Sequence, residues 1–243
     1  MKRITIITSL YKASSYLEGF LENIVQQTFF SKCKLFLLNA NSPENEDKII
    51  APYLNEYANN ILYEKLDEDP GLYECWNYMI RNTKTEYITN ANVDDKLFPT
   101  CIEEHVNFLD ENKDIDVAYC FNATTYDQET TFSDFNGQIN IFPTAAYSYE
   151  NLKRGNLPHN HPVWRRDLHE KNGWFSNDYK SGSDWDFWLR CGANGSKMHL
   201  IEKVLGIYYK NPEGVSTKKE NMERNLQEVW DIRNKYEEVD GLD

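Results

Sequence analysis

Strand-like and helix-like segments alternate through the first hundred residues of this chain, and that order limits the fold more than any other feature. Four short runs rich in β-branched or other apolar residues have the pattern of buried strands: residues 2–9, 34–38, 60–63 and 86–89. Three segments between them carry apolar residues at helical spacing: residues 14–29, 43–57 and 71–81. We predict helix caps at Ser14 and Ser42. The alternation predicts an α/β fold, with a mostly parallel, doubly wound sheet flanked by helices.

The second half of the chain is less regular. Helices are predicted over residues 98–112, 183–191 and 218–236, and a strand over residues 115–121. Residues 122–146 break into short pieces that indicate a hairpin or flap, and residues 197–209 indicate two short strands. The last helix is predicted to be amphipathic, with apolar residues at Met222, Leu226, Val229, Trp230 and Tyr236. We expect one domain over residues 1–243.

The chain is strongly acidic: 39 Asp and Glu residues against 26 Lys and Arg residues give a formal charge of −13. Such a surface repels phosphate backbones, so we expect no nucleic-acid partner. For the same reason, an anionic substrate would need a cation or local N–H donors to bind.

The location of the chain is also constrained by sequence. The longest apolar runs, residues 4–10 and 35–38, are far shorter than the ~20 residues of a membrane-spanning helix, and no signal peptide is evident. Five cysteines are scattered without a Cys-x-x-Cys pair, which indicates a reducing compartment. We therefore expect a cytoplasmic protein with no integral membrane segment.

Polar residues follow the predicted strands at the edge where open α/β sheets bind ligands, in residues 9–14, 39–45 and 90–95. Asp94 and Asp95 come directly after a strand, beside Asn90 and Asn92. Hard oxygen ligands in this position suit Mg²⁺ or Mn²⁺. The spacing is equally compatible with two acids that only cap the next helix.

Two further clusters carry candidate chemistry. Asp184 opens a predicted helix beside Trp185, where it could act as a general base; the competing interpretation is an ordinary acidic first turn with buried aromatic residues. His159 and His161 have no third metal ligand nearby, so contact with solvent or substrate is favoured over zinc binding. The signature motifs of dehydrogenases, P-loop NTPases, zincins and α/β-hydrolases are absent from the sequence.

Taken in order, several segments resemble the family-2 glycosyltransferases of GT-A fold. Their first strand and donor loop are similar to residues 6–12, the end of their first helix to 26–28, and their nucleotide loop to 37–44. A donor-side segment of bacterial members resembles residues 67–77, and the strand with the metal motif resembles residues 85–95. The acceptor-side series is similar to residues 164–166, 173–175 and 183–190. The resemblance covers roughly residues 3–217.

The resemblance implies an inverting glycosyltransferase that moves a sugar from a nucleotide-diphosphate-sugar, with a UDP-sugar as the expected donor, to the hydroxyl of a glycan or glycoconjugate acceptor. It implies a divalent metal (Mn²⁺ or Mg²⁺) at Asp94 and Asp95, and Asp184 as the catalytic base. The other implied contacts are with the donor for Thr8, Leu10, Asn39, Gly71, Asn92 and Asp94, and with the acceptor for His159, His161 and Trp185. Residues 1–97 would bind the nucleotide-sugar and residues 98–217 the acceptor, followed by a C-terminal helix over 218–243. The role allows a peripheral position at a membrane-bound acceptor.

Four positions depart from the family pattern. Asn39 and Asn92 stand where the family usually has Asp, and Ser183 stands where it has Glu. The segment after the last strand lacks the metal-side His, for which Asn211 or Lys210 is the expected substitute. These changes motivate an alternative, a degenerate GT-A module that binds nucleotide-sugar or glycan without turnover. A nucleotidyltransferase is disfavoured, because residues 8–14 are neither Gly-rich nor basic enough.

Overall fold

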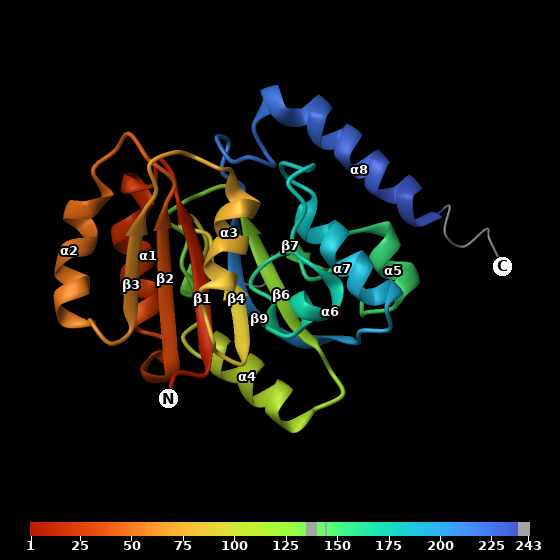
Figure 1. Cartoon of the computed structure of the whole chain (residues 1–243), viewed down its shortest axis with the longest axis horizontal. Coiled ribbons are helices and arrows are strands. Elements are labelled where there is room, and N and C mark those ends of the chain that lie inside the picture. Colours follow the sequence, from red (N-terminus) through yellow and green to blue (C-terminus); the bar gives the residue numbers. More distant parts are fainter. Residues whose placement is uncertain (135–139, 144, 238–243) are drawn as a thin grey trace.

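A computed structural model describes residues 1–134, 140–143 and 145–237 of the chain (Figure 1). The remaining parts of the predicted hairpin or flap, and residues 238–243 of the predicted C-terminal segment, lie outside the described residues. None of the described helices is both long and apolar enough to cross a bilayer.

The predicted parallel sheet is confirmed for the first four strands. β1 (Ile4–Leu10), β2 (Cys33–Asn39), β3 (Ile61–Lys65) and β4 (Tyr87–Asn90) pair in the order β3-β2-β1-β4, all parallel. Since the connections between them are helical, every strand runs the same way and the carboxyl ends meet at one edge. That edge carries the loops that the sequence singled out.

Antiparallel pairing extends the sheet beyond β4. β8 (Val163–Arg165) lies antiparallel to β4, and the order continues through β6 (Val117–Thr125), β9 (Met198–Tyr209) and β5 (Lys96–Leu97), with β7 (Asn140–Phe142) paired to β6. The prediction of two short strands over residues 197–209 is wrong, because β9 is a single strand. Its pairing with β6 shifts register between Ile201 and Val204, so the polar pair Glu202 and Lys203 is accommodated as a bulge.

Helices cover both faces of the sheet. α1 (Ser14–Val25), α2 (Glu46–Glu56) and α4 (Cys101–Glu111) bury apolar residues in one cluster with Ile4 and Ile6 of β1. α3 (Leu72–Arg81), α5 (Tyr149–Arg154), α6 (Leu168–Asn172) and α7 (Ser183–Ala193) bury theirs in a second cluster with Ile7. Successive residues of a strand point to opposite faces, which explains the division.

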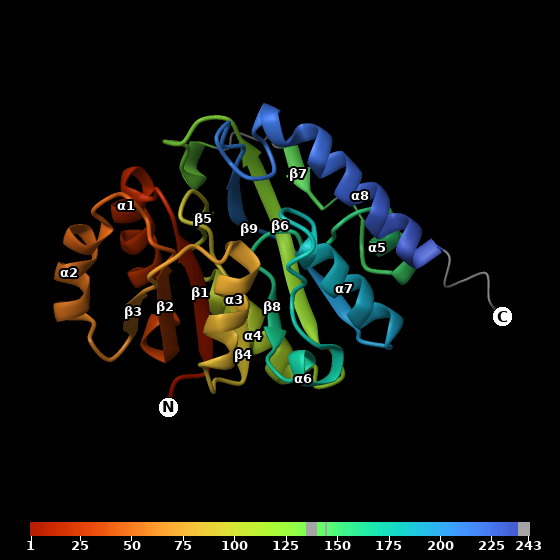
Figure 2. The same cartoon turned by 45° about the horizontal axis from the view of Figure 1, so that its top comes forward.

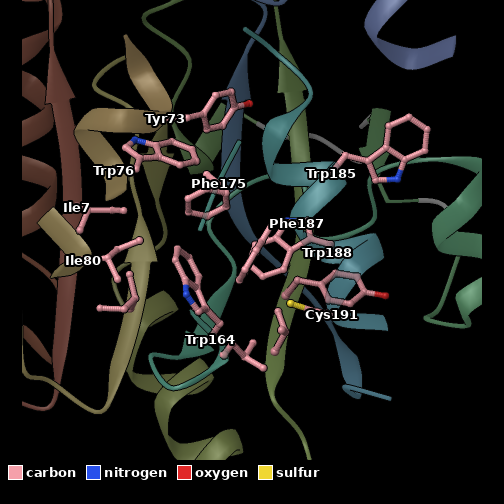
Figure 3. Packing of buried hydrophobic residues seen from close by; sticks show 14 of the residues in the cluster. Ile7, Tyr73, Trp76, Ile80, Trp164, Phe175, Trp185, Phe187, Trp188 and Cys191 are labelled. Carbon is pink, nitrogen blue, oxygen red and sulfur yellow. The ribbon is translucent and has the colours of Figure 1, made fainter. Parts of the chain in front are cut away.

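The second cluster is mainly aromatic and joins α3 to α7. Figure 3 shows Phe175 pointing between Trp76 of α3 and Phe187 of α7, with ring centroids 5.5 Å and 4.8 Å away. Trp164 of β8 closes the group against Trp188. Tilted and edge-on packing of this kind adds to the gain from burial. The donor-side helix α3 and the helix with Asp184 are therefore held in one rigid group.

Both predicted serine caps are wrong. The residue before α1 is Ala13, and no side chain caps that helix. α2 begins at Glu46 after Asn45, because Ser42 is engaged in the preceding loop, where its hydroxyl donates to Glu46 and accepts the N–H of Lys12. The Ser42 hydroxyl therefore links the two loops and does not cap α2.

The predicted apolar side of the last helix is confirmed for Val229 and Tyr236, which pack in or against the core, and is wrong for the other three residues. After short 3₁₀ turns at Phe132–Asp134 and Lys219–Asn221, α8 (Met222–Glu237) buries Glu228, Ile232 and Tyr236. Met222, Leu226 and Trp230 are instead 56%, 64% and 65% exposed. The three buried positions recur every four residues, so they form one helix face, and a buried acid is the first of the three. Figures 1 and 2 both show α8 running past α7 and α5.

Candidate active site

The loops after β1 and β2 are tied together by buried polar contacts. The N–H groups of Lys12 and Ala13 donate to Ser42 Oγ at 3.0 Å and to Glu46 Oε1 at 3.1 Å. Ser42 Oγ donates to the same Glu46 oxygen at 2.6 Å. Because Glu46 is fully buried, these bonds form away from competing water and fix the two loops against each other.

Three of the residues expected to hold the nucleobase are fully buried: Thr8, Leu10 and Asn39. Thr8 Oγ1 donates to the carbonyl of Ala91 at 3.0 Å, and Asn39 Oδ1 accepts the N–H of Ser42 at 2.8 Å. The amide nitrogen of Asn39 makes no hydrogen bond of standard geometry within the described residues. These side chains support the loops from inside, so a base at this edge would meet backbone atoms of the two loops.

Gly71 precedes α3 in a backbone conformation with φ of +92°, which side-chain-bearing residues rarely adopt. Its N–H donates to Asp69 Oδ1 at 2.8 Å. A β-carbon at this position would lie 4.0 Å from Lys180 Nζ, so an exposed cation lies next to the glycine. This is the local positive charge that an anionic ligand of an acidic protein requires.

Asp94 and Asp95 have different surroundings. Asp95 is 3% exposed and accepts hydrogen bonds from the Tyr209 N–H at 3.0 Å, Asn92 Nδ2 at 3.0 Å and Asn160 Nδ2 at 3.3 Å. Burial, together with the charge of Asp94, raises the pKa of Asp95 well above its usual range. Asp95 therefore links three segments through hydrogen bonds, and its role as a metal ligand stays a prediction.

Asp94 is only partly buried, and its contact with a side chain is with Asn211, whose Nδ2 donates to Asp94 Oδ2 at 2.9 Å. Burial raises the pKa of Asp94, and the bond from Asn211 opposes that change. Lys210, the other expected substitute for the family His, points to the hydroxyl of Tyr126 at 3.4 Å. Of the two, Asn211 is the residue beside the carboxylate.

The residues around Asp94 fit a metal that binds together with a phosphate-bearing ligand. Within the described residues, no group of three or more His, Cys, Asp or Glu side chains converges to hold an ion. Mg²⁺ and similar ions are commonly held by one or two carboxylates, with substrate phosphates and water completing the shell. Asp94, with its carboxylate oriented by Asn211 Nδ2, matches that donor set.

Asp184 lies in the first turn of α7 and is held by two side chains from other helices. Tyr73 of α3 donates to Asp184 Oδ1 at 3.1 Å, and Asn156, just after α5, donates to Oδ2 at 2.7 Å. Burial raises the pKa of Asp184, while the nearby His159, Asn156 and Tyr73 act in the opposite direction. A carboxylate with a raised pKa and a fixed orientation suits a general base.

The residues expected on the acceptor side are more buried than their sequence context indicated. His161 is 1% exposed, and burial lowers its pKa to about 3, so the expectation of a solvated side chain is wrong for it. Trp185 is 4% exposed and donates Nε1–H to the Leu152 carbonyl at 2.7 Å, so it is buried as the competing interpretation expected, with its ring turned away from Phe175 in Figure 3. Its contact with the acceptor stays a prediction. His159 is partly exposed, and its ring packs edge-on at 5.0 Å from that of Tyr208.

The hydroxyl of Tyr208 lies within the electrostatic reach of all three carboxylates. Burial raises the pKa of Tyr208, and the charges of Asp95, Asp94 and Asp184 raise it further. The Tyr209 N–H bonds to Asp95 and Asn211 bonds to Asp94, so the loop after β4 meets the end of β9 here, with Asp184 of α7 close enough for its charge to act on Tyr208. Sequence reasoning missed Tyr208 in this role and also Tyr73 and Asn156, the partners of Asp184.

The fold is the GT-A fold of glycosyltransferases. The S. aureus protein TarS, solved with UDP-GlcNAc, superposes with a TM-score of 0.73 at 16% identity, over 95% of this chain and 66% of that one. The mannosyltransferase PcManGT from Pyrobaculum calidifontis, solved with GDP-Man and Mn²⁺, gives a TM-score of 0.71 at 15% identity, over 94% and 63% of the two chains.

Residues 5–172 match the sequence profile described as glycosyl transferase family 2, and the chain belongs to that family. It is 32% identical over 115 residues to the minor teichoic acid biosynthesis protein GgaB of Bacillus subtilis, which is 46% of this chain but only 13% of GgaB. An uncharacterized glycosyltransferase of Methanocaldococcus jannaschii is 24% identical over 213 residues, or 84% of this chain and 70% of the relative.

Proposed function

We propose that this protein transfers a sugar from a nucleotide-diphosphate-sugar to an acceptor hydroxyl, with inversion at the anomeric carbon. The observation that carries the proposal is the pair of carboxylates: Asp94, bonded by Asn211 just after β9, and Asp184, whose two oxygens are held by Tyr73 and Asn156. A carboxylate open to a metal and a second carboxylate held as a base are the two groups that this reaction needs.

In this proposal Asp184 accepts the proton of the acceptor hydroxyl as the oxygen attacks the anomeric carbon. Tyr73 and Asn156 orient the carboxylate, since each donates to a different oxygen of Asp184. Inversion follows from a single displacement in which the acceptor oxygen enters opposite the departing diphosphate.

On the donor side, Gly71 would leave room for the diphosphate and Lys180 would lie beside it. Asp94, with Asn211, would hold Mn²⁺ or Mg²⁺, and such an ion supplies charge neutralisation of the leaving diphosphate when bound. Asn92 would contribute only through its backbone or its amide oxygen, because its Nδ2 is bonded to Asp95.

We infer that the donor is a UDP-sugar and that the acceptor is a glycan or glycoconjugate of polysaccharide synthesis. TarS was solved with UDP-GlcNAc, and one relative is a teichoic acid biosynthesis protein, which supports both choices. PcManGT was solved with GDP-Man, so GDP-sugars are the competing donors. We further propose a cytoplasmic protein that works peripherally at a membrane-bound acceptor.

The second candidate is a module that binds nucleotide-sugar without turnover. The observation that favours it is the use of Asn39 and Asn92 as internal hydrogen-bonding residues where the family pattern has acids. It predicts donor binding and no product with any acceptor.

A thermal-shift panel of UDP-, GDP- and dTDP-sugars, with and without Mn²⁺, tests donor class and metal dependence together. A donor at one hundred times its Kd stabilises the folded state by about 2.7 kcal/mol. We expect that shift for a UDP-sugar only when Mn²⁺ is present, followed by release of UDP when a glycan acceptor is added. Stabilisation without release for every acceptor would favour the binding module, and no stabilisation by any donor would overturn both.

A further inference from the structure

A buried acid of the C-terminal helix contacts the start of α7. Glu228 is 6% exposed, and its carboxylate accepts the backbone N–H groups of Lys180 at 2.8 Å, Ser181 at 2.8 Å and Gly182 at 3.1 Å. The hydroxyl of Ser181 adds a fourth bond at 3.0 Å. Three consecutive N–H groups on one carboxylate are the arrangement by which helix N-termini bind anions.

We call these three N–H groups, together with the Glu228 carboxylate, the cradle; it lies directly before the helix that carries Asp184. Gly182 is the residue before α7, and Asp184 is the second residue of that helix. Of the three donors, only the cap residue Gly182 belongs to the terminus of α7, and the other two lie in the loop before it. Glu228, 46 to 48 residues further along the chain, therefore binds the loop that enters the helix, next to the positive end of the helix dipole. The backbone that leads into Asp184 is therefore fixed by α8.

A second contact brings α8 to the same turn. A β-carbon at Gly182 would lie 2.6 Å from Ile232 Cδ1, so the tip of the Ile232 side chain packs directly against the backbone of Gly182. One turn further on, the buried Asp186 accepts bonds from Lys235 at 2.5 Å and from the hydroxyl of Tyr236 at 3.1 Å. Helix α8 therefore contacts this segment both before Asp184, at Gly182, and after it, at Asp186.

Packing alone does not require an acid here. Ile232 and Tyr236 would attach α8 by apolar contact, whereas an unpaired buried carboxylate is costly and is tolerated only when hydrogen bonds satisfy it. The acid is matched to the three N–H groups of the loop. Its effect is to fix that loop and not merely to bury surface.

We propose that Glu228 is a positioning residue for the catalytic base, holding the backbone of Asp184 while Tyr73 and Asn156 hold its side chain. This inference rests on the proposed function, because it assigns Glu228 a part in the same transfer. It gives the C-terminal helix a task in the reaction, although α8 supplies no group that touches substrate.

The test compares Glu228→Gln with Glu223→Gln, an exposed glutamate of the same helix. In Glu228→Gln the shape is kept, but an amide NH₂ faces N–H donors, so the loop loses part of its anchor. We expect kcat, normalised to the concentration of protein that binds the donor, to fall on the order of 10- to 100-fold. The KM for the donor should change less than about twofold. Hydrogen exchange of a peptide covering residues 180–189 should rise. Glu223→Gln should match the wild type in all three.

A third variant separates positioning from stability. Ile232→Ala loosens the packing of α8 but leaves the cradle, so it should lower Tm while keeping kcat within about threefold. If Glu228→Gln does not yield folded protein, Glu228→Asp takes its place; its shorter side chain keeps the charge but cannot reach all three N–H groups.

The outcomes are distinguishable. Wild-type transfer together with unchanged kcat and unchanged exchange in Glu228→Gln would overturn the positioning role and leave the proposed function standing. Equal losses of kcat in Ile232→Ala and Glu228→Gln at equal Tm would also overturn it. Absence of transfer by the wild type with any donor and acceptor would refute the proposed function, and the positioning role with it.

Discussion

Asn211 Nδ2 donates a hydrogen bond to Asp94 Oδ2 at 2.9 Å, joining the segment after β9 to the segment after β4. The bond places a neutral amide at the edge of the carboxylate, and the oxygen of that amide accepts the N–H of Glu213 at 3.0 Å. In a site with a single open acid, that amide decides how the carboxylate is oriented.

The first prediction concerns this pair. Asn211→Ala should weaken Mn²⁺-dependent donor binding on the order of tenfold, because Asp94 loses the partner that orients its carboxylate. Lys210→Ala is the matched control, since Lys210 contacts Tyr126 and not Asp94. Titration calorimetry with a UDP-sugar and Mn²⁺ measures both. Equal weakening in the two variants would contradict the assignment.

The second prediction separates the adjacent acids. Asp95→Ala leaves three buried donors without a partner, so the free energy of unfolding should fall by about 2–4 kcal/mol and Tm on the order of 5–15 °C. Asp94→Ala removes a partly exposed acid with one bonded side chain and should cost less than about 1 kcal/mol, while abolishing the effect of Mn²⁺ on donor binding.

Urea unfolding followed by circular dichroism gives both free energies, and thermal shift with Mn²⁺ gives the ligand response. An Asp95→Ala protein that is as stable as the wild type, but whose donor binding no longer responds to Mn²⁺, would show that Asp95 is a metal ligand.

The third prediction concerns the base. Asp184→Asn should lower kcat by a factor on the order of 10³ or more, because the amide cannot accept a proton while the hydrogen bond from Tyr73 still orients it. Donor affinity should stay within about threefold of the wild type. Asp114→Asn, an exposed acid paired with Lys197 and not in contact with any of the residues around Asp184, is the control. Full activity in Asp184→Asn would reject the assignment.

The parallel half of the fold could be predicted from sequence because its signals are local. Residues 4–10 alternate between two buried faces, and the helices that follow are long enough for their periodicity to be read. Pairing in the second half depends on contacts between distant segments, so neither the antiparallel β8 nor the continuous β9 could be foreseen. The exposed Glu202 and Lys203 looked like the end of a strand and are a bulge within one.

The candidate site divides in the same way. Asp94 and Asp184 were found because each follows a strand or opens a helix, which are features of local sequence. The exposure of a side chain is not local: Asp95 and His161 are buried by segments that arrive from elsewhere in the chain. The burial of Glu228 could not be predicted from its residue type, because an acid on an amphipathic helix is normally assigned to the solvent side.

The last prediction concerns pH. Asp184 accepts a proton only when ionised, and burial raises its pKa above the ordinary value of about 3.9. Transfer should therefore be full above the raised pKa and should be lost as pH falls through it. The hydrogen bond from Asn156 Nδ2 favours the ionised form. Asn156→Ala should raise the pKa of Asp184 further and move the acid limb of kcat to higher pH by about one unit.

The control for this shift is Asn151→Ala on α5, since Asn151 bonds to the Ala146 carbonyl and not to Asp184. The measurement is kcat at saturating donor and acceptor between about pH 4.5 and 8. An acid limb that is the same in Asn156→Ala and Asn151→Ala would mean that a group other than Asp184 accepts the proton.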